Sequence, residues 1–170
     1  MASASPRRKE LLEQIGLRFE VEPSDYEEDI VPGSEPHEMA RKLSLGKARA
    51  AARKHRNALI IAADTFVVFG DRVLGKPHSN AEAREMLRAL NGQAHSVITG
   101  FTILDTETGK VLSRSVETRV HMRKLTLKEI DSYVRTKEPL GKAGGYAIQG
   151  LGRFWWTGSK GTTAMWSACL

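Results

Sequence analysis

Apolar residues recur with a helical period in two segments near the start of the chain. Leu11, Leu12 and Ile15 share one helical face, which predicts a helix over residues 6–15. After an acidic loop and a proline-containing turn region, the pattern predicts a second helix over about residues 38–54.

The next segment predicts a buried strand followed by a hairpin. The apolar run at residues 58–63 is typical of a strand covered on both faces, and it delivers Asp64 and Thr65 at its end. Residues 66–74 predict a hairpin that turns at Gly70-Asp71. A carboxylate is therefore expected where a buried strand meets a loop.

Helix and strand patterns alternate again in the second half of the chain. Asn80 is expected to cap a helix that ends at Leu90, and Thr126 is expected to cap a last helix that ends near residue 136. Period-two alternation predicts two long antiparallel strands, over residues 95–104 and 111–122. The predicted fold class is mixed α/β.

Length and charge bound the organisation of the molecule. The 170 residues, of which 41% are hydrophobic, suffice for one sizeable core, so a single domain over residues 1–170 is expected. The net charge is +6, but the basic residues are dispersed through the sequence. A phosphate-bearing small molecule fits this charge as well as a nucleic acid does.

Cysteine content and the longest apolar run bear on the compartment. Cys169 is the only cysteine, which excludes an intramolecular disulfide framework and a cysteine-rich zinc site. The longest apolar run, at residues 58–63, is too short to cross a bilayer, and no signal-peptide pattern is found. We expect a cytoplasmic protein with no membrane partner.

The segment Ser3-Ala4-Ser5-Pro6-Arg7-Arg8 has the composition of a phosphate-binding loop. Ser5 can cap the following helix with Pro6 in its first turn, which favours an anion at the helix N-terminus. Arg7 and Arg8 add permanently charged, forked donors that suit phosphoryl oxygens. A capped helix with a solvated basic face is the alternative interpretation.

Other candidate residues have equally ordinary alternatives. Asp64 follows a buried strand, where a carboxylate needs partners or a task, but it could also be a turn-forming aspartate. Lys76 could bind phosphate or lie solvated at the surface, and His95 is more typical of a packed or edge histidine than of a catalyst. The glycines at 144 and 145 have neither the Rossmann nor the P-loop spacing.

The order of these separate signals resembles the Maf family. The shared motifs run from Ala2 to about Gly152: Ala2-Ser3-Ala4-Ser5-Pro6-Arg7-Arg8, Leu45-Gly46-Lys47-Ala48-Arg49-Ala50, Ala63-Asp64-Thr65, Leu74-Gly75-Lys76-Pro77, His95-Ser96-Val97-Ile98-Thr99-Gly100 and Lys142-Ala143-Gly144-Gly145-Tyr146-Ala147-Ile148-Gln149-Gly150. The resemblance implies a curved mixed sheet with flanking helices that form a two-lobed cleft. It also implies a nucleoside triphosphate pyrophosphatase that cleaves the bond between the α- and β-phosphates.

The resemblance implies a role for each site residue. Asp64 would be the proton acceptor, and Glu28 and Asp64 would hold a divalent cation, with Mg²⁺ expected and Mn²⁺ as an alternative. The residues implied in phosphate binding are Ser3, Arg7, Lys47 and Lys76.

Base preference is also implied by the resemblance alone. The family branch that acts on dTTP and UTP is similar to this chain in having Arg8, Thr65 and Gln149 at its discriminating positions. The expected substrates are therefore dTTP and UTP, with modified pyrimidine nucleotides as further candidates. A homodimer is a candidate oligomeric state.

Both ends of the chain depart from the family pattern. Family members place an apolar strand before the first loop, and Met1 leaves almost none of it, so an upstream start is expected. From residue 153 to 170 the sequence is atypical. Back-translated and read one base earlier, this tail permits Leu-Val-Asp-Gly-Ile-Lys-Gly-Asp-Tyr-Ser-Asn-Val-Val-Gly-Leu, which resembles the missing family ending. We hypothesise a frameshift there, which would scramble one core strand.

Two alternatives to an active enzyme remain. A non-catalytic Maf remnant would keep the site residues in a compromised fold. A basic nucleic-acid-binding α/β module would explain the charge, but no aromatic RNA-binding motif, zinc-finger spacing or clustered basic helix is found. No nucleic-acid partner is therefore expected.

Overall fold

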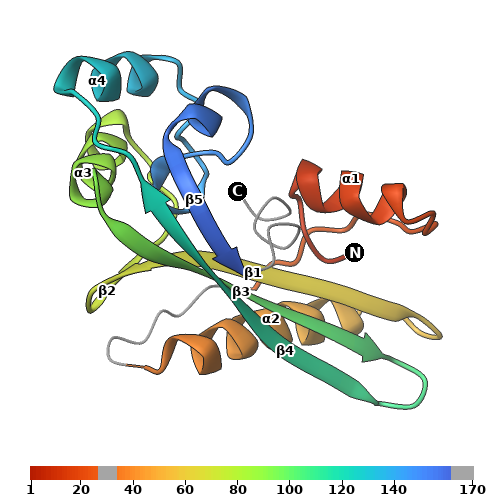
Figure 1. The fold of residues 1–170 in the computed structure, drawn as a ribbon. Coiled ribbons are helices and arrows are strands. Elements are labelled where there is room, and N and C mark those ends of the chain that lie inside the picture. The colour runs from red at the N-terminus through yellow and green to blue at the C-terminus, as the bar shows by residue number, and fades with distance from the viewer. Residues whose placement is uncertain (27–33, 162–170) are drawn as a thin grey trace. The chain divides into compact units, whose positions relative to one another are not determined.

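The computed structural model describes residues 1–26 and 34–161 and shows a mixed α/β protein, as predicted (Figure 1). The described strands form a sheet in the order β2-β1-β3-β4-β5. They are β1 Leu59–Phe69, β2 Arg72–Leu74, β3 Ala94–Asp105, β4 Val111–Met122 and β5 Trp156–Gly161. The helices are α1 Pro6–Gln14, α2 Pro36–Ala52, α3 Asn80–Leu90 and α4 Leu127–Arg135, with short 3-10 turns η1 Ala143–Gly145 and η2 Gly150–Phe154. None of these helices is both long and apolar enough to span a membrane.

Packing divides the chain into two compact units that interleave along the sequence. Among the described residues, the first unit comprises 1–64 and 99–116, and the second comprises 65–98 and 117–161. The strands β1, β3 and β4 each contribute residues to both units. The single domain over residues 1–170 and its cleft stay predictions.

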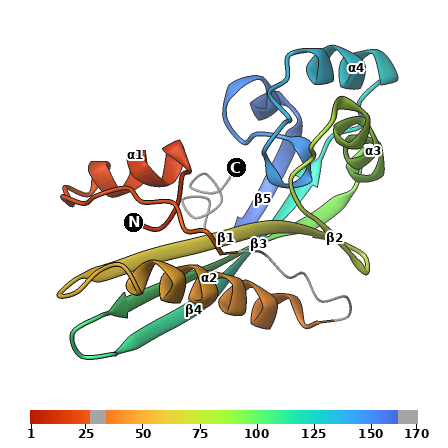
Figure 2. The same ribbon diagram turned by 180° about the vertical axis from the view of Figure 1, so that it is seen from behind.

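In the first unit, α2 lies along β1 and β3, as both ribbon views show (Figures 1 and 2). Ser44 on α2 forms a buried hydrogen bond of 2.9 Å with Thr102 on β3. Gly100 on β3 lies directly under the Ala40 carbonyl of α2. The apolar cluster between these elements consists of Ala2, Ala48, Ala51, Ile60, Ala62 and Leu104.

In the second unit, α3 packs against α4 and against the turn η1. Their shared core includes Val67, Leu87, Val120, Ile130 and Tyr146. The Thr126 cap is confirmed, because Thr126 and Glu129 form a complete capping box. The predicted Asn80 cap is wrong by one residue: Ser79 is the N-cap, and its hydroxyl accepts a hydrogen bond from the Glu82 N–H at 3.2 Å.

The predicted break after residue 63 is not found. β1 continues without interruption through Asp64 and Thr65 to Phe69. The residues that follow Asp64 are apolar and buried, with Phe66 2% and Val67 0% exposed, so they favour continuation of the strand. Asp64 itself is tolerated within a strand because it has a cationic partner, described below.

α1 begins at Pro6 as predicted but differs in its cap and its packing. Ser5 occupies the N-cap position, yet its side chain makes no capping hydrogen bond. No residue of the helix is buried, and Ile15 just beyond its end is 70% exposed. The expected apolar face of this helix is therefore only partly covered, since Leu11 and Leu12 are half-buried and Ile15 is exposed.

Part of the atypical tail is ordered in the second unit. β5 pairs antiparallel with β4, with Ser159 opposite Val120. Trp155 is 6% exposed, and its ring centroid lies 4.1 Å from that of Tyr133. Residues 156–161 thus form a strand whose backbone pairs with the edge of β4, and the frameshift stays a hypothesis. Residues 162–170 lie outside the described part.

Candidate functional site

The centre of the candidate site is a buried ion pair between Lys47 on α2 and Asp64 on β1. The ammonium group donates a hydrogen bond to Asp64 Oδ1. The side chains are 12% and 6% exposed, so both charges are largely withdrawn from water. Asp64 is in phase with Ile60 and Ala62 along the strand, which directs it to the face that α2 covers.

The N-terminal loop lies beside the same stretch of β1. The Ala2 N–H donates to the Ile61 carbonyl at 2.8 Å. Arg8 Nη1 donates to Ser3 Oγ at 2.8 Å and to the Ala63 carbonyl at 2.7 Å. The first unit thus brings Ser3 and Arg8 next to the residue that precedes Asp64. Arg7 lies beside Arg8 in the first turn of α1 and is half-buried.

The second unit holds the other predicted residues. Lys76 is flanked by two backbone hydrogen bonds to the glycine-rich loop: Gly144 N–H donates to the Gly75 carbonyl at 3.0 Å, and Gly141 N–H donates to the Pro77 carbonyl at 3.4 Å. A Cβ at Gly144 would lie 2.8 Å from Val67 Cγ2, and its φ is +70°, so only glycine fits.

The remaining two residues of the second unit differ in burial. Gln149 is exposed and follows a run of buried residues from 143 to 148. Thr65 is 6% exposed, and because successive side chains of a strand alternate, it faces the opposite side of β1 from Asp64. Because Thr65 is buried, it can contact a ligand directly only if the residues around it shift slightly.

Only part of the predicted cation site can be described. Glu28 lies outside the described residues. Within residues 1–26 and 34–161, no group of three or more His, Cys, Asp or Glu side chains is arranged to hold a metal. Asp64 is a suitable single ligand, since Mg²⁺ binds proteins through one or two carboxylates and completes its shell with water and substrate phosphates.

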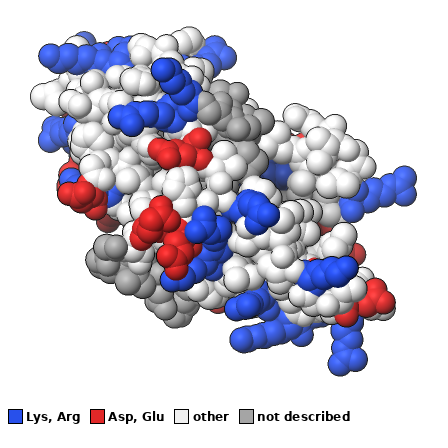
Figure 3. All heavy atoms as spheres, turned by 60° about the horizontal axis from the view of Figure 1, so that its bottom comes forward, with Lys and Arg blue, Asp and Glu red and all other residues white. Residues whose placement is uncertain are grey.

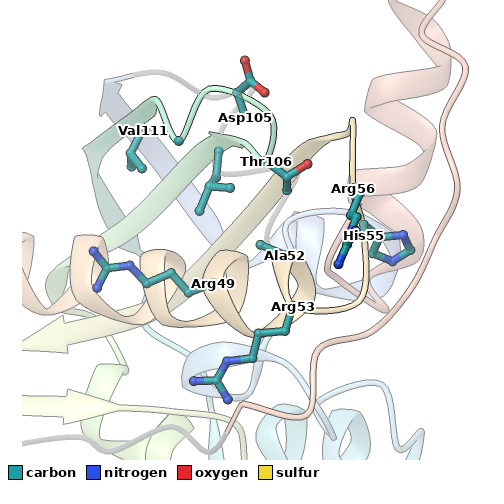
Figure 4. Close-up of a pocket in the computed structure, with 10 residues that line it drawn as sticks. Arg49, Ala52, Arg53, His55, Arg56, Asp105, Thr106 and Val111 are labelled. Carbon is teal, nitrogen blue, oxygen red and sulfur yellow. The ribbon is translucent and has the colours of Figure 1, made fainter.

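A pocket of about 400 Å³ in the first unit is basic but contains none of the predicted site residues. Figure 4 shows Arg49 on α2 and Arg53 at the C-cap of this helix, with His55 and Arg56 in the segment that follows. Cations are stabilised at a helix C-terminus by the helix dipole, which explains these charges without a ligand. On the face drawn in Figure 3, basic and acidic side chains are interspersed.

His95 is a packed histidine, as predicted. It is 3% exposed, and its Nε2 is 2.6 Å from the Tyr146 hydroxyl. Burial, with a smaller contribution from the charge of His121, lowers the pKa of His95 to about 4. The neutral imidazole is therefore the form that the folded protein holds.

The lowered pKa of His95 predicts a pH dependence of stability. An unfolded histidine binds a proton below about pH 6.5, whereas the folded one does so only near pH 4, so stability is complete above pH 6.5 and falls between these values. We expect the free energy of unfolding in urea to fall by about 2 kcal/mol from pH 7.5 to pH 5 because of this residue. His95→Gln should remove that part of the dependence, and an identical pH profile in the variant would contradict the assignment.

Comparisons with known proteins agree with the motif order. A relative from Methanosarcina barkeri named dTTP/UTP pyrophosphatase is 51% identical over 153 residues, which cover 89% of this chain and 78% of the relative. A relative of the same name from Syntrophotalea carbinolica is 47% identical over 154 residues, covering 89% and 70%. A solved nucleoside-triphosphatase, also titled dITP/XTP pyrophosphatase, from Mycobacterium abscessus superposes with a TM-score of 0.44 at 16% identity over 73% of each chain, too distant a likeness to support a conclusion. The family model described as Maf-like protein matches residues 1–163. The chain therefore belongs to the Maf family.

Proposed function

We propose that this protein hydrolyses dTTP and UTP, and modified pyrimidine triphosphates, to the monophosphate and pyrophosphate. The observation that carries the proposal is the buried Lys47–Asp64 pair beside the loop of Ser3 and Arg8. The names of the relatives from Methanosarcina barkeri and Syntrophotalea carbinolica support the choice of substrates. The proposed substrate is a small molecule, with no nucleic-acid partner.

The proposed chemistry places proton transfer at Asp64. Its carboxylate accepts the proton of a water molecule that attacks the α-phosphorus, and the bond from that phosphorus to the bridging oxygen breaks to release pyrophosphate. Lys47 has three N–H donors, so it can hold Asp64 and still donate to a phosphate oxygen. Electrostatic stabilisation of the charge that develops on the phosphates supplies most of the rate enhancement.

The other residues bind and orient the substrate. Ser3, Arg7 and Lys76 are proposed to donate to phosphate oxygens, while Arg8, Thr65 and Gln149 select the base. The hydrogen bonds of Arg8 to Ser3 and to the Ala63 carbonyl give it a second task, which is to hold the N-terminal loop against β1.

A divalent cation, Mg²⁺ or Mn²⁺, is proposed to be held by Asp64 and Glu28. When bound, the cation would neutralise phosphate charge. Mg²⁺ prefers oxygen ligands, and the Asp64 carboxylate supplies oxygen atoms.

The test of the proposed function is pyrophosphate release from dTTP, UTP, CTP and GTP in the presence of Mg²⁺. We expect release from dTTP and UTP above the other two. The assay should compare the chain as it stands with a version whose tail is restored to the alternative frame. Activity in the restored version alone would favour the non-catalytic remnant for this chain, and no release from either version would contradict the proposal. Steeply salt-dependent binding of nucleic acid would instead support the alternative that the protein is a basic nucleic-acid-binding α/β module.

A further inference from the structure

The carboxylate of Glu138 fixes the chain directly after Gln149. Its Oε2 accepts a hydrogen bond from the Leu151 N–H at 3.2 Å, and its Oε1 accepts one from the Gly152 N–H at 3.1 Å. A carboxylate that accepts backbone N–H groups on both oxygens holds that backbone in one register. All of these residues belong to the second unit.

Tyr133 connects the same carboxylate to the chain before Gln149. The tyrosine hydroxyl donates to Glu138 Oε1 at 2.9 Å and accepts a hydrogen bond from the Ala147 N–H at 3.0 Å. Tyr133 is 3% exposed and packs against Trp155, so the hydroxyl has little freedom to move. Gln149 thus lies between two backbone segments that are anchored to one carboxylate.

The glycines of this loop show how closely it surrounds Glu138. A Cβ at Gly150 would lie 2.8 Å from Glu138 Oε2, and the φ of this glycine is +72°. A Cβ at Gly152 would lie 2.3 Å from the Ala147 carbonyl oxygen and 2.9 Å from the Tyr133 hydroxyl. A side chain at either position would displace the loop. Glycine at 150 and 152 therefore allows the segment Gln149-Gly150-Leu151-Gly152 to close around the Glu138 carboxylate.

We propose that Glu138 is a positioning residue for base selection, acting through Tyr133 and the backbone of residues 147–152 on Gln149. The inference rests on the proposed function, in which Gln149 reads the pyrimidine edge. Hydrogen-bonded recognition of a base requires the amide to be held within a fraction of an ångström, and an exposed side chain on a loose loop does not meet that requirement. Glu138 supplies the missing rigidity.

The inference predicts that Glu138→Gln weakens base selection through Gln149 alone. The substitution turns one acceptor oxygen into an N–H donor, so at least one of the three hydrogen bonds is lost. We expect the ratio of kcat/KM for UTP over GTP to fall about tenfold, mainly through a higher KM for UTP. In a Gln149→Ala background, Glu138→Gln should leave the remaining ratio unchanged, since its effect passes through Gln149.

Glu129→Gln is the matched control. Glu129 also accepts a backbone hydrogen bond in the second unit, from the Thr126 N–H at 2.8 Å, but it belongs to the capping box of α4. The Glu129→Gln substitution should reduce the stability of the protein without changing its preference for UTP. Tyr133→Phe, which keeps the ring and removes only the hydroxyl contacts, should reproduce the loss of preference if Glu138→Gln fails to fold.

Hydrogen exchange provides a readout that needs no substrate. The amides of Leu151 and Gly152 should exchange faster in Glu138→Gln than in the wild type, while those of α4 keep their protection. An unchanged UTP preference in folded Glu138→Gln or Tyr133→Phe, or independent effects of the Glu138 and Gln149 substitutions, would overturn the inference. A wild-type protein that hydrolyses none of the triphosphates would instead overturn the proposed function on which it rests.

Discussion

Asp64→Asn should reduce the rate of pyrophosphate release from dTTP and UTP by roughly 10²–10⁴-fold, because an amide cannot accept the proton of the attacking water. The substitution is nearly isosteric, and its carbonyl oxygen can still accept the hydrogen bond from Lys47. Substrate binding should therefore change less than turnover. Steady-state kinetics with Mg²⁺ would separate the two effects.

The buried charge of Lys47 complicates this variant, and a second substitution controls for it. Removing one member of a buried ion pair leaves the other uncompensated, at a cost of about 3 kcal/mol in stability. Lys47→Met combined with Asp64→Asn removes both charges and should recover much of that stability without recovering activity. Recovery of turnover in the double variant would show that Asp64 acts only as the partner of Lys47.

Gly100→Ala should be among the most destabilising single substitutions in the first unit. A Cβ at this position would lie 2.0 Å from the Ala40 carbonyl oxygen and 2.3 Å from its carbon. These are backbone atoms of α2, so the helix itself must move away from β3. We expect a loss of about 3 kcal/mol in the free energy of unfolding, measured by urea denaturation.

The same displacement should reach the candidate site. α2 also carries Lys47, so its shift should lengthen the contact with Asp64 and reduce activity. Gly158→Ala is the control, since a Cβ there meets no atom of residues 1–26 and 34–161 within 4 Å. Equal stability of Gly100→Ala and Gly158→Ala would contradict the close packing of α2 on β3.

The strands and helices with a clean periodic pattern were predictable from the sequence. The helix at Asn80–Leu90 and the strands over residues 95–104 and 111–122 agree with the structure within a residue or two. The break at Asp64 was predicted wrongly because a buried carboxylate is normally a loop signal. The cation that compensates it, Lys47, comes from a different element and leaves no local trace in the sequence.

The candidate site was predictable in part, through motif order more than through local chemistry. Lys47 pairs with Asp64, and Arg8 bonds to Ser3 and to the Ala63 carbonyl, a backbone partner that could not be foreseen. The roles of these residues stay predictions. The hydrogen bonds of Glu138 to the loop left no recognisable signal in the sequence either. Its partners are backbone N–H groups, which every residue except proline carries, so side-chain patterns do not mark them.

Hydrolysis of UTP in water enriched with ¹⁸O tests the central claim most directly. Attack at the α-phosphorus, assisted by Asp64, places the label in the monophosphate and leaves the pyrophosphate unlabelled, with one of each formed per turnover. Mass spectrometry of the products should show that distribution of the label. Asp64→Asn should slow the formation of the labelled monophosphate. Label in the pyrophosphate, or release of a nucleoside diphosphate and orthophosphate, would contradict the account.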